Sequence, residues 1–280
     1  MKNVLVPVDF SPTSRNAALY AMGWVSQVLG KKVVLYHAFQ TALAAFHANP
    51  DLEGLNEEDL QPEKEDQIYA MKQELIAETR LPVQVETKCV YEIFEEDLTA
   101  VCRQTATQLV IMGITGGGLL KEKLIGSNAL KVARHTANQV IIVPPDARFS
   151  GIRRVMLLTD YEQVDLTTPF DAIHQLLELT GAELEVVHVE ESKEQAREHT
   201  QIIRQENAVM HQHLRSYHPK YYIAYNQSFE QAVHDLVQQH SVDLIIVIPK
   251  KIGYMDRLIN SSHTDALVFH SHVPVMVAHK

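Results

Sequence analysis

The chain has 280 residues, of which 46% are hydrophobic and 21% are charged, so it is long enough for one large soluble domain or two ordinary ones. Its formal net charge of -10 argues against nucleic acid or an anionic membrane as the main partner, because both would repel such a surface. Its two cysteines, Cys89 and Cys102, stand outside any CxxC or metal-ligand spacing, and we expect reduced structural thiols.

No targeting or membrane segment is predicted. The N-terminal stretch MKNVLVPVDF has too few apolar residues for a signal-peptide core before Asp9 interrupts it. Later apolar runs fall well short of the roughly 20 residues that span a bilayer. We therefore expect a cytoplasmic protein without a membrane partner.

Short runs rich in Val and Ile alternate with longer amphipathic segments along the first half. The expected strands are residues 3–8, 32–37, 83–89, 109–112 and 140–143. Between them, apolar residues recur every three or four positions in SRNAALYAMGWVSQVLG, KEDQIYAMKQELIAETR and IFEEDLTAVCRQT, which predicts helices. The runs that begin at Leu109 and Leu244 are apolar on both faces, as in central strands of a parallel sheet covered by helices on each side.

The second half repeats the first. VLVPVDFSPTSRNA is echoed by VMLLTDYEQVDLTT at an offset of 151, which also places His37 on His188. Further along, the offset falls to 135, so the first half has 16 additional residues. We expect them in FQTALAAFHANPDLEGLNEEDLQ, which has loop composition, and we expect the part from Thr41 to Leu60 to be mobile, as a lid or an oligomer interface.

These patterns predict an α/β protein of two tandem open doubly wound domains, each a five-stranded parallel sheet flanked by helices. The boundary is expected within PPDARFSG. The first domain then covers residues 1–147 and the second covers residues 151–280.

The stretch VIMGITGGGLLKEKLIGS, residues 110–127, runs an expected strand directly into glycines. Two residues separate Gly113 from Gly116, and nine more separate Gly116 from Gly126, which lies just before the helix expected to begin at Ser127. Glycines let the backbone approach a ligand closely, and the free amides of a helix start favour an anion. The arrangement suits a phosphate chain, although it is neither a P-loop nor the GxGxxG of a dinucleotide fold.

A Gly-x2-Gly-x9-Gly-Ser pattern late in an α/β domain, preceded by an Asp that closes the first strand, resembles the universal stress protein family. VPVDFS, YHA, VIMGITGG and IGSNA carry the resemblance, which covers the chain as two tandem copies. It implies a fold of the adenine-nucleotide α-hydrolase type that binds ATP, or AMP or ADP, with or without Mg2+.

By this resemblance Asp9 faces the ribose, and the backbone near Pro7, Val8 and Ala38 holds the adenine. The remaining nucleotide-binding positions that it implies are Met112, Gly113, Thr115, Gly116, Gly126, Ser127, Asn128 and Ala129. Asn128 is a mild departure, because members that bind nucleotide often have a small or β-branched residue there. Four basic residues flank the loop and either offset the phosphate charge or form a solvated face: Lys121, Lys123, Lys131 and Arg134.

The second half has lost the glycine pattern. At the offset of 135 the three glycines fall on Ile248, Lys251 and Ser261, whose side chains would fill the space of a phosphate chain. We expect this domain to bind no ATP, or something smaller, and mainly to pair with the first. In the family two domains associate through their last strands, and QVIIVPP and VPVMVAHK are expected to do so within this chain.

Neither a metal site nor a catalytic residue is predicted. His211 and His213 lie two apart on a helix, and His270 and His272 have no carboxylate or cysteine at ligand spacing. The recurring His37 and His188 are expected to be satisfied core histidines.

Three functions stay open. We favour a nucleotide-binding regulatory or stress-response protein, because neither a GxSxG elbow nor a dedicated general base is visible. The alternatives are a slow ATP-hydrolysing enzyme and an interaction module without nucleotide. A homo-oligomer and a protein partner of unknown kind also remain open.

Overall fold

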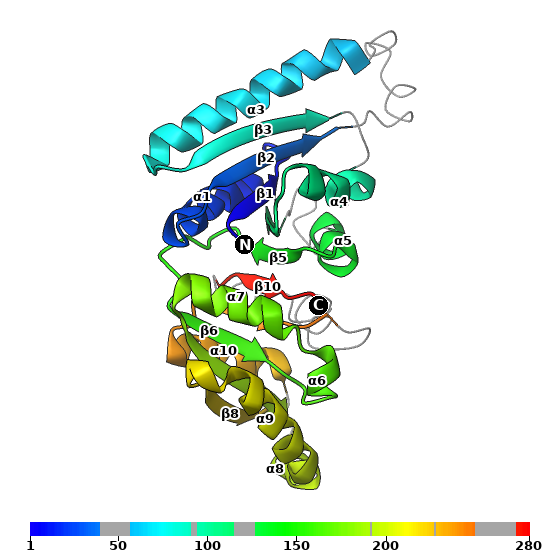
Figure 1. Cartoon of the computed structure of the whole chain (residues 1–280), viewed down its shortest axis with the longest axis vertical. Coiled ribbons are helices and arrows are strands. Elements are labelled where there is room, and N and C mark those ends of the chain that lie inside the picture. The colour runs from blue at the N-terminus through cyan, green and yellow to red at the C-terminus, as the bar shows by residue number, and fades with distance from the viewer. Residues whose placement is uncertain (40–56, 91–93, 115–126, 191, 227, 250–272) are drawn as a thin grey trace.

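A computed structural model describes residues 1–39, 57–90, 94–114, 127–190, 192–226, 228–249 and 273–280 (Figure 1). The first half contains β1 (Asn3–Pro7), α1 (Pro12–Gln27), β2 (Lys32–Ala38), α3 (Glu57–Thr79), β3 (Gln84–Val90), α4 (Phe94–Gln104), β4 (Leu109–Gly113), α5 (Ser127–His135) and β5 (Gln139–Val143). The second half contains β6 (Arg154–Leu158), α6 (Val164–Thr167), α7 (Phe170–Thr180), β7 (Glu183–Glu190), α8 (Lys193–Glu198), α9 (Thr200–Leu214), η2 (Arg215–Tyr217), β8 (Lys220–Tyr225), α10 (Phe229–His240), β9 (Leu244–Val247) and β10 (Val275–Val277).

All ten of these strands form one sheet in the order β3-β2-β1-β4-β5-β10-β9-β6-β7-β8. Pairing is parallel throughout except between β5 and β10, which run antiparallel. The predicted α/β class with parallel strands flanked by helices is therefore confirmed. The two halves do not form two separate five-stranded sheets, because β5 and β10, the last strands of the two halves, pair with each other.

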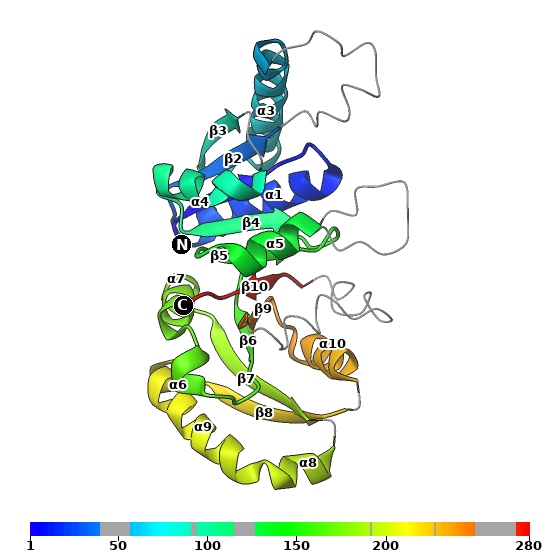
Figure 2. The ribbon, with the colours of Figure 1, turned by 90° about the vertical axis from the view of Figure 1, so that its right-hand side faces the viewer.

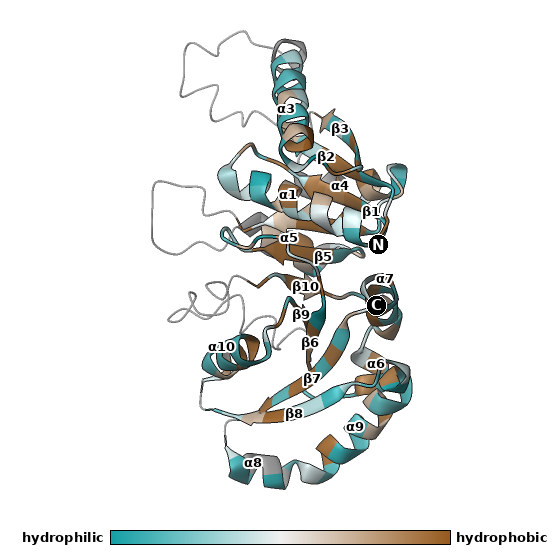
Figure 3. Ribbon diagram, turned by 90° about the vertical axis from the view of Figure 1, so that its left-hand side faces the viewer, coloured by the Kyte–Doolittle hydropathy of each residue, from teal (hydrophilic) through white to brown (hydrophobic). Residues whose placement is uncertain are grey.

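The central strands are apolar on both sides because helices cover both faces. In β1, Val4 and Val6 pack into one core and Leu5 packs into the other. Helices α1, α3, α7 and α9 contribute to the first core, whereas α4, α5 and α10 contribute to the second. Each core therefore runs through both halves, and Figure 3 shows the hydrophobic stretches of strand and helix meeting along the sheet.

The seam between the halves is short and buried. Val275, Met276 and Val277 pair with Ile142, Ile141 and Val140. At its end, the Gln139 side chain donates to the His279 carbonyl at 3.0 Å and accepts from the His279 amide at 2.8 Å. The two segments expected to pair do so, while the proposed domain limits at residues 147 and 151 stay a prediction.

The segment that connects the halves lies along α1 rather than hanging free. Asn16 Nδ2 donates to the carbonyls of Pro144 at 3.1 Å and Ala147 at 2.9 Å. Gln27 bonds both the amide and the carbonyl of Ile152, at 2.8 and 3.0 Å. These four hydrogen bonds fix both ends of the connecting segment to one helix.

Between those ends Phe149 sits over Gly23, where an added Cβ would lie 2.4 Å from Phe149 Cδ1. The ring also packs edge-on against Tyr20, with centroids 5.0 Å apart. The missing side chain at Gly23 therefore makes the notch that admits the ring.

Two helices differ from the sequence expectation. The stretch expected as a loop ends inside α3, which begins at Glu57; residues 40–56 lie outside the described residues. The second-half counterpart of α1 is divided into α6 and α7. Pro169 separates them, because proline disfavours the helical conformation in the residue before it and cannot donate its own amide.

Candidate functional site

The strand order of the first half reverses at β1. This strand pairs with β2 on one side and with β4 on the other, and the two connections that leave β1 and β4 cross opposite faces of the sheet. Ligands of open α/β sheets bind where such connections diverge, beyond the carboxyl ends of the strands. Figure 2 shows the carboxyl end of β4 and the amino end of α5 at this edge.

Asp9 follows β1 at this edge and is exposed. Its Oδ1 accepts from the Ser11 amide at 3.0 Å and from Ser11 Oγ at 2.5 Å. Ser11 is also the N-cap of α1, where its hydroxyl accepts from the Ser14 amide at 3.2 Å. The start of α1 therefore orients the Asp9 carboxyl group.

Partial burial acts to raise the pKa of Asp9, but hydrogen bonds from Ser11 and Ser14 outweigh it and hold the pKa below its ordinary value. The group is thus a carboxylate at neutral pH, suited to accept hydrogen bonds from hydroxyl groups or to attract a cation.

His37 lies beside Asp9 at the end of β2. It is 9% exposed, and its Nδ1 lies 2.7 Å from the Val8 carbonyl, which requires a hydrogen on Nδ1. Burial lowers its pKa even though this bond acts in the opposite direction. Phe10 and Phe39 flank the ring, with centroids 4.5 and 5.9 Å away. The histidine is satisfied at Nδ1, while Nε2 has no hydrogen-bond partner among the described residues.

The other residues that the family resemblance assigns to adenine lie at the ends of β1 and β2. Pro7 and Val8 are buried, and Ala38 is half-buried. The Val8 amide donates to the Tyr36 carbonyl at 2.8 Å, which extends the β1–β2 ladder past the last residue of β1. The fold thus brings Pro7, Val8, Asp9 and Ala38 to one edge.

Gly113 ends β4 and has a packing reason to be glycine. A Cβ at this position would lie 2.6 Å from the Thr13 carbonyl oxygen, because the first turn of α1 crosses directly over it. The side chains of Met112, on β4, and Ala129, on α5, are buried in the second core, so only their backbones can face a ligand.

The rest of the glycine motif is described in part. Ser127 and Asn128 begin α5, whereas Thr115, Gly116, Gly126, Lys121 and Lys123 lie outside the described residues. Lys131 and Arg134 are exposed on α5. Arg134 is about 10 Å along the helix axis from Ser127, and its role beside a phosphate stays a prediction.

The second half repeats part of this geometry and changes its chemistry. His188 Nδ1 lies 2.8 Å from the Thr159 carbonyl, the counterpart of the His37–Val8 contact. Its Nε2, however, lies 3.0 Å from Glu190 Oε1, and the same oxygen is 3.0 Å from His199 Nδ1. The sequence signal was present, since Glu190 stands where Phe39 stands at the offset of 151.

Other histidines pair locally. His211 Nδ1 lies 3.3 Å from the Tyr221 hydroxyl, and His213 Nε2 lies 3.1 Å from Asp165 Oδ1. His270 and His272 lie outside the described residues. Within the described part of the chain no group of three or more His, Cys, Asp or Glu side chains is placed to hold a metal. None of the helices described there is long and apolar enough to cross a membrane.

Comparison with known proteins assigns the chain to a family. The model of the universal stress protein family matches residues 1–144. A universal stress protein from Archaeoglobus fulgidus DSM 4304 shares 16% identity and a TM-score of 0.67, over 99% of this chain and 96% of that one. A putative universal stress protein from Pseudomonas aeruginosa UCBPP-PA14 shares 14% identity and a TM-score of 0.57, over 100% and 93%.

At these identities the solved structures show likeness of fold alone, and no curated protein matches the sequence. The family match covers about half of the chain and coincides with the half that carries the glycine motif. The chain belongs to the universal stress protein family.

Proposed function

We propose that the first half binds an adenine nucleotide, ATP above all, and that the protein has a regulatory or stress-response role. The observation that carries the proposal is Asp9, an exposed carboxylate oriented by Ser11 at the point where the strand order reverses. In this proposal Asp9 accepts hydrogen bonds from the ribose hydroxyls.

The described residues fit the adenosine end of such a ligand. Phe10 and Phe39 offer apolar ring surface beside the backbone of Val8 and Ala38, where the base is proposed to lie. The phosphates are assigned to the amides at the start of α5 and to the glycines before it, because a helix N-terminus favours an anion. Mg2+ would offset phosphate charge in a protein of net charge -10.

The second half is proposed to serve mainly as the pairing partner. Glu190 places a buried carboxylate beside His188, at the position where the first half has Phe39. A carboxylate there offers neither ring surface to a base nor attraction to a phosphate. This reason is independent of the lost glycines.

Calorimetric titration of the full chain with ATP tests the proposal. Asp9→Asn should weaken binding by about tenfold or more, because a charged hydrogen-bond acceptor is lost. The matched control is Asp160→Asn, which removes the same charge at the corresponding position of the second half. Thermal unfolding of both variants separates a binding effect from damage to the Ser11 cap.

If both variants bind ATP as tightly as the unmodified chain, Asp9 has no role in binding. If both variants lose the same affinity, the effect comes from net charge rather than from a site. Gly116→Val and Gly126→Val test the phosphate end and should each abolish measurable binding. Nucleotide released from the purified protein distinguishes binding from a nucleotide-free module, and phosphate release distinguishes binding from hydrolysis.

A further inference from the structure

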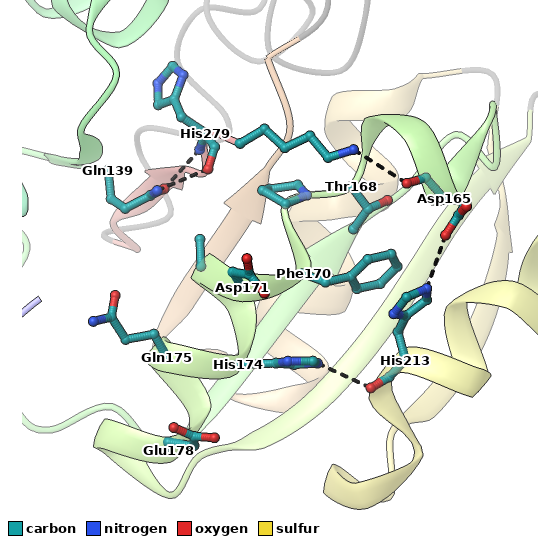
Figure 4. Close-up of a pocket in the computed structure, with 13 residues that line it drawn as sticks. Gln139, Asp165, Thr168, Phe170, Asp171, His174, Gln175, Glu178, His213 and His279 are labelled. Atoms are coloured by element: carbon teal, nitrogen blue, oxygen red, sulfur yellow. Dashed lines mark hydrogen bonds and ion pairs between the residues drawn. The ribbon is translucent and has the colours of Figure 1, made fainter.

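A cavity of about 780 Å³ lies on the second half, along α7 and against the end of α9 (Figure 4). It is far along the chain from the glycine motif and lies beside the seam. Its lining includes Asp165, Phe170, Asp171, His174, Glu178 and His213.

The internal repeat relates this cavity to the groove that seats the connecting segment on α1. At the offset of 151, Tyr20, Gly23 and Gln27 of α1 fall on Asp171, His174 and Glu178 of α7. These three α1 residues line the cavity beside the connecting segment, as their three counterparts line the cavity on α7. The two cavities are therefore equivalent places in the two halves.

The sides of the two cavities that lie opposite α1 and α7 also correspond. At the offset of 135, Glu78 near the end of α3 falls on His213 near the end of α9, and both line their cavities. The same offset places Pro145, in the connecting segment, on Lys280. The chain thus enters the α7 groove at the point where it enters the α1 groove.

The α1 groove shows what such a surface accommodates. Its occupant is the connecting segment, residues 144–152, which begins with a turn closed by the Ala147 amide and the Pro144 carbonyl at 3.1 Å. Asn16 and Gln27 bind this segment through its backbone carbonyls and an amide. In the α7 groove His279 and Lys280 lie on the corresponding path, and the Lys280 ammonium donates to the Leu166 carbonyl at 2.6 Å. Asp171, Gln175 and Glu178 remain exposed along the helix.

The chemistry of the α7 groove differs from that of its counterpart in charge. Tyr20 and Gln27 are replaced by carboxylates at Asp171 and Glu178, and Asp165 adds a third acidic side chain whose Oδ1 contacts His213. Among the described residues that line the groove, Lys280 is the only Lys or Arg, and its ammonium is directed to main-chain carbonyls. The groove is therefore acidic along its open side.

The groove also has ring surface between its acidic side chains. Phe170 and His213 stack with centroids 3.9 Å apart and planes 12° apart, and Figure 4 shows His174 on the neighbouring turn of α7. Guanidinium groups pair with carboxylates in planar geometry and stack on rings, so this combination suits arginine side chains above all.

We propose that the α7 groove binds an extended segment of a partner protein that carries arginine or lysine side chains. The backbone of that segment would follow the path that residues 144–152 follow on α1, and its basic side chains would meet Asp171 and Glu178. The inference does not depend on nucleotide binding in the first half.

Fluorescence anisotropy with two labelled heptapeptides tests it on the full chain without nucleotide. The basic probe PRARFRG is the connecting sequence PDARFSG with two arginines introduced, and the acidic probe PEAEFEG has the same length and the same phenylalanine. The basic probe should bind at least about tenfold more tightly than the acidic one, and Asp171→Asn with Glu178→Gln should remove most of that difference.

Glu194→Gln with Asp235→Asn is the matched control, because it removes the same charge from α8 and α10, outside the lining. This control should leave the affinity for PRARFRG within about twofold of the unmodified chain. No detectable binding of PRARFRG, equal affinity for both probes, or equal weakening by the groove variant and the control would each overturn the proposal.

Discussion

Glu190 places a buried carboxylate at the carboxyl end of β7. It is 7% exposed, and its Oε1 lies 3.0 Å from a ring nitrogen of both His188 and His199. Burial acts to raise the pKa of Glu190, but the hydrogen bonds and charges of the two histidines outweigh it and hold the pKa below its ordinary value of 4.5. The folded state therefore favours the ionised form.

That preference makes part of the stability of the second half depend on pH. Because the folded-state pKa is lowered, the contribution is complete above pH 4.5 and is lost as the pH falls through the folded-state pKa. Glu190→Gln should reduce the free energy of unfolding at pH 7 by about 1–2 kcal/mol, and the difference should shrink at acidic pH. Urea unfolding at several pH values measures it.

Glu194→Gln, an exposed change on the nearby helix α8, is the control and should have little effect at any of these pH values. A difference between Glu190→Gln and the unmodified chain that stays constant from pH 7 to about pH 3 would contradict the pairing of Glu190 with the two histidines.

Single residues also mark what sequence patterns can and cannot indicate. The repeat placed His37 and His188 at equivalent positions, and in both copies the Nδ1 atom meets a backbone carbonyl of the neighbouring strand end. The family resemblance implied a phosphate role for Gly113, which stays a prediction, and the structure adds a packing reason for glycine there, because the first turn of α1 at Thr13 excludes a side chain. Thr13 and Gly113 are distant in sequence, so no local pattern contains their contact.

Among the helices, α1 connects the candidate site to the rest of the molecule. It begins at the Ser11 cap beside Asp9, packs on β4, and binds the connecting segment through Asn16 and Gln27. The notch at Gly23 is the tightest of these contacts.

Gly23→Ala should reduce stability by about 1–2 kcal/mol, although alanine favours a helix over glycine, because overpacking against Phe149 outweighs the gain in helix propensity. In the background of Phe149→Ala the same change should become neutral or stabilising. Chemical unfolding of the four proteins in a double-mutant cycle measures the coupling. A stabilising effect of Gly23→Ala in the unmodified chain would show that Phe149 does not fill the notch.

The predicted strands and helices agree closely with the observed ones where the hydrophobic periodicity is strong. The expected first-half strands agree with β1 to β5 to within one residue at each end, since apolar runs bounded by polar residues mark buried strands. The division into α6 and α7 was missed, although Pro169 signalled it, because alignment with the continuous α1 masked the break. The early start of α3 at Glu57 was also missed, because an acidic, glycine-containing stretch precedes it.

At the scale of the whole molecule, the seam turns two halves into one sheet. Met276 is fully buried and pairs with Ile141 across the seam and with Ile246 within its own half. The expected last-strand pairing followed from the family resemblance, whereas the groove on α7 did not, because its lining comes from distant segments.

Met276→Asp should lower stability by about 3 kcal/mol or more, because it buries an unpaired charge between two strands. We expect it to separate the unfolding of the two halves. Trp24, the single tryptophan, is buried in the first half, so its fluorescence reports that half while circular dichroism reports both. The two signals should change together in the unmodified chain and separately in the variant.

Ile223→Asp on the edge strand β8 is the control, since Ile223 is 40% exposed there, and it should leave the two signals coincident. Coincident signals in Met276→Asp as well would mean that the seam is not what couples the halves.

Because the two halves of the internal repeat are joined in one polypeptide, they are always present in equal numbers. A pair of identical subunits separates on dilution and presents the same chemistry twice, whereas a covalent link holds its two parts at an effective concentration in the millimolar range, roughly independent of how much protein is present. Here the strand ends beside Phe39 and those beside Glu190 are unlike. Every molecule therefore carries one set of strand ends of each kind, at any protein concentration.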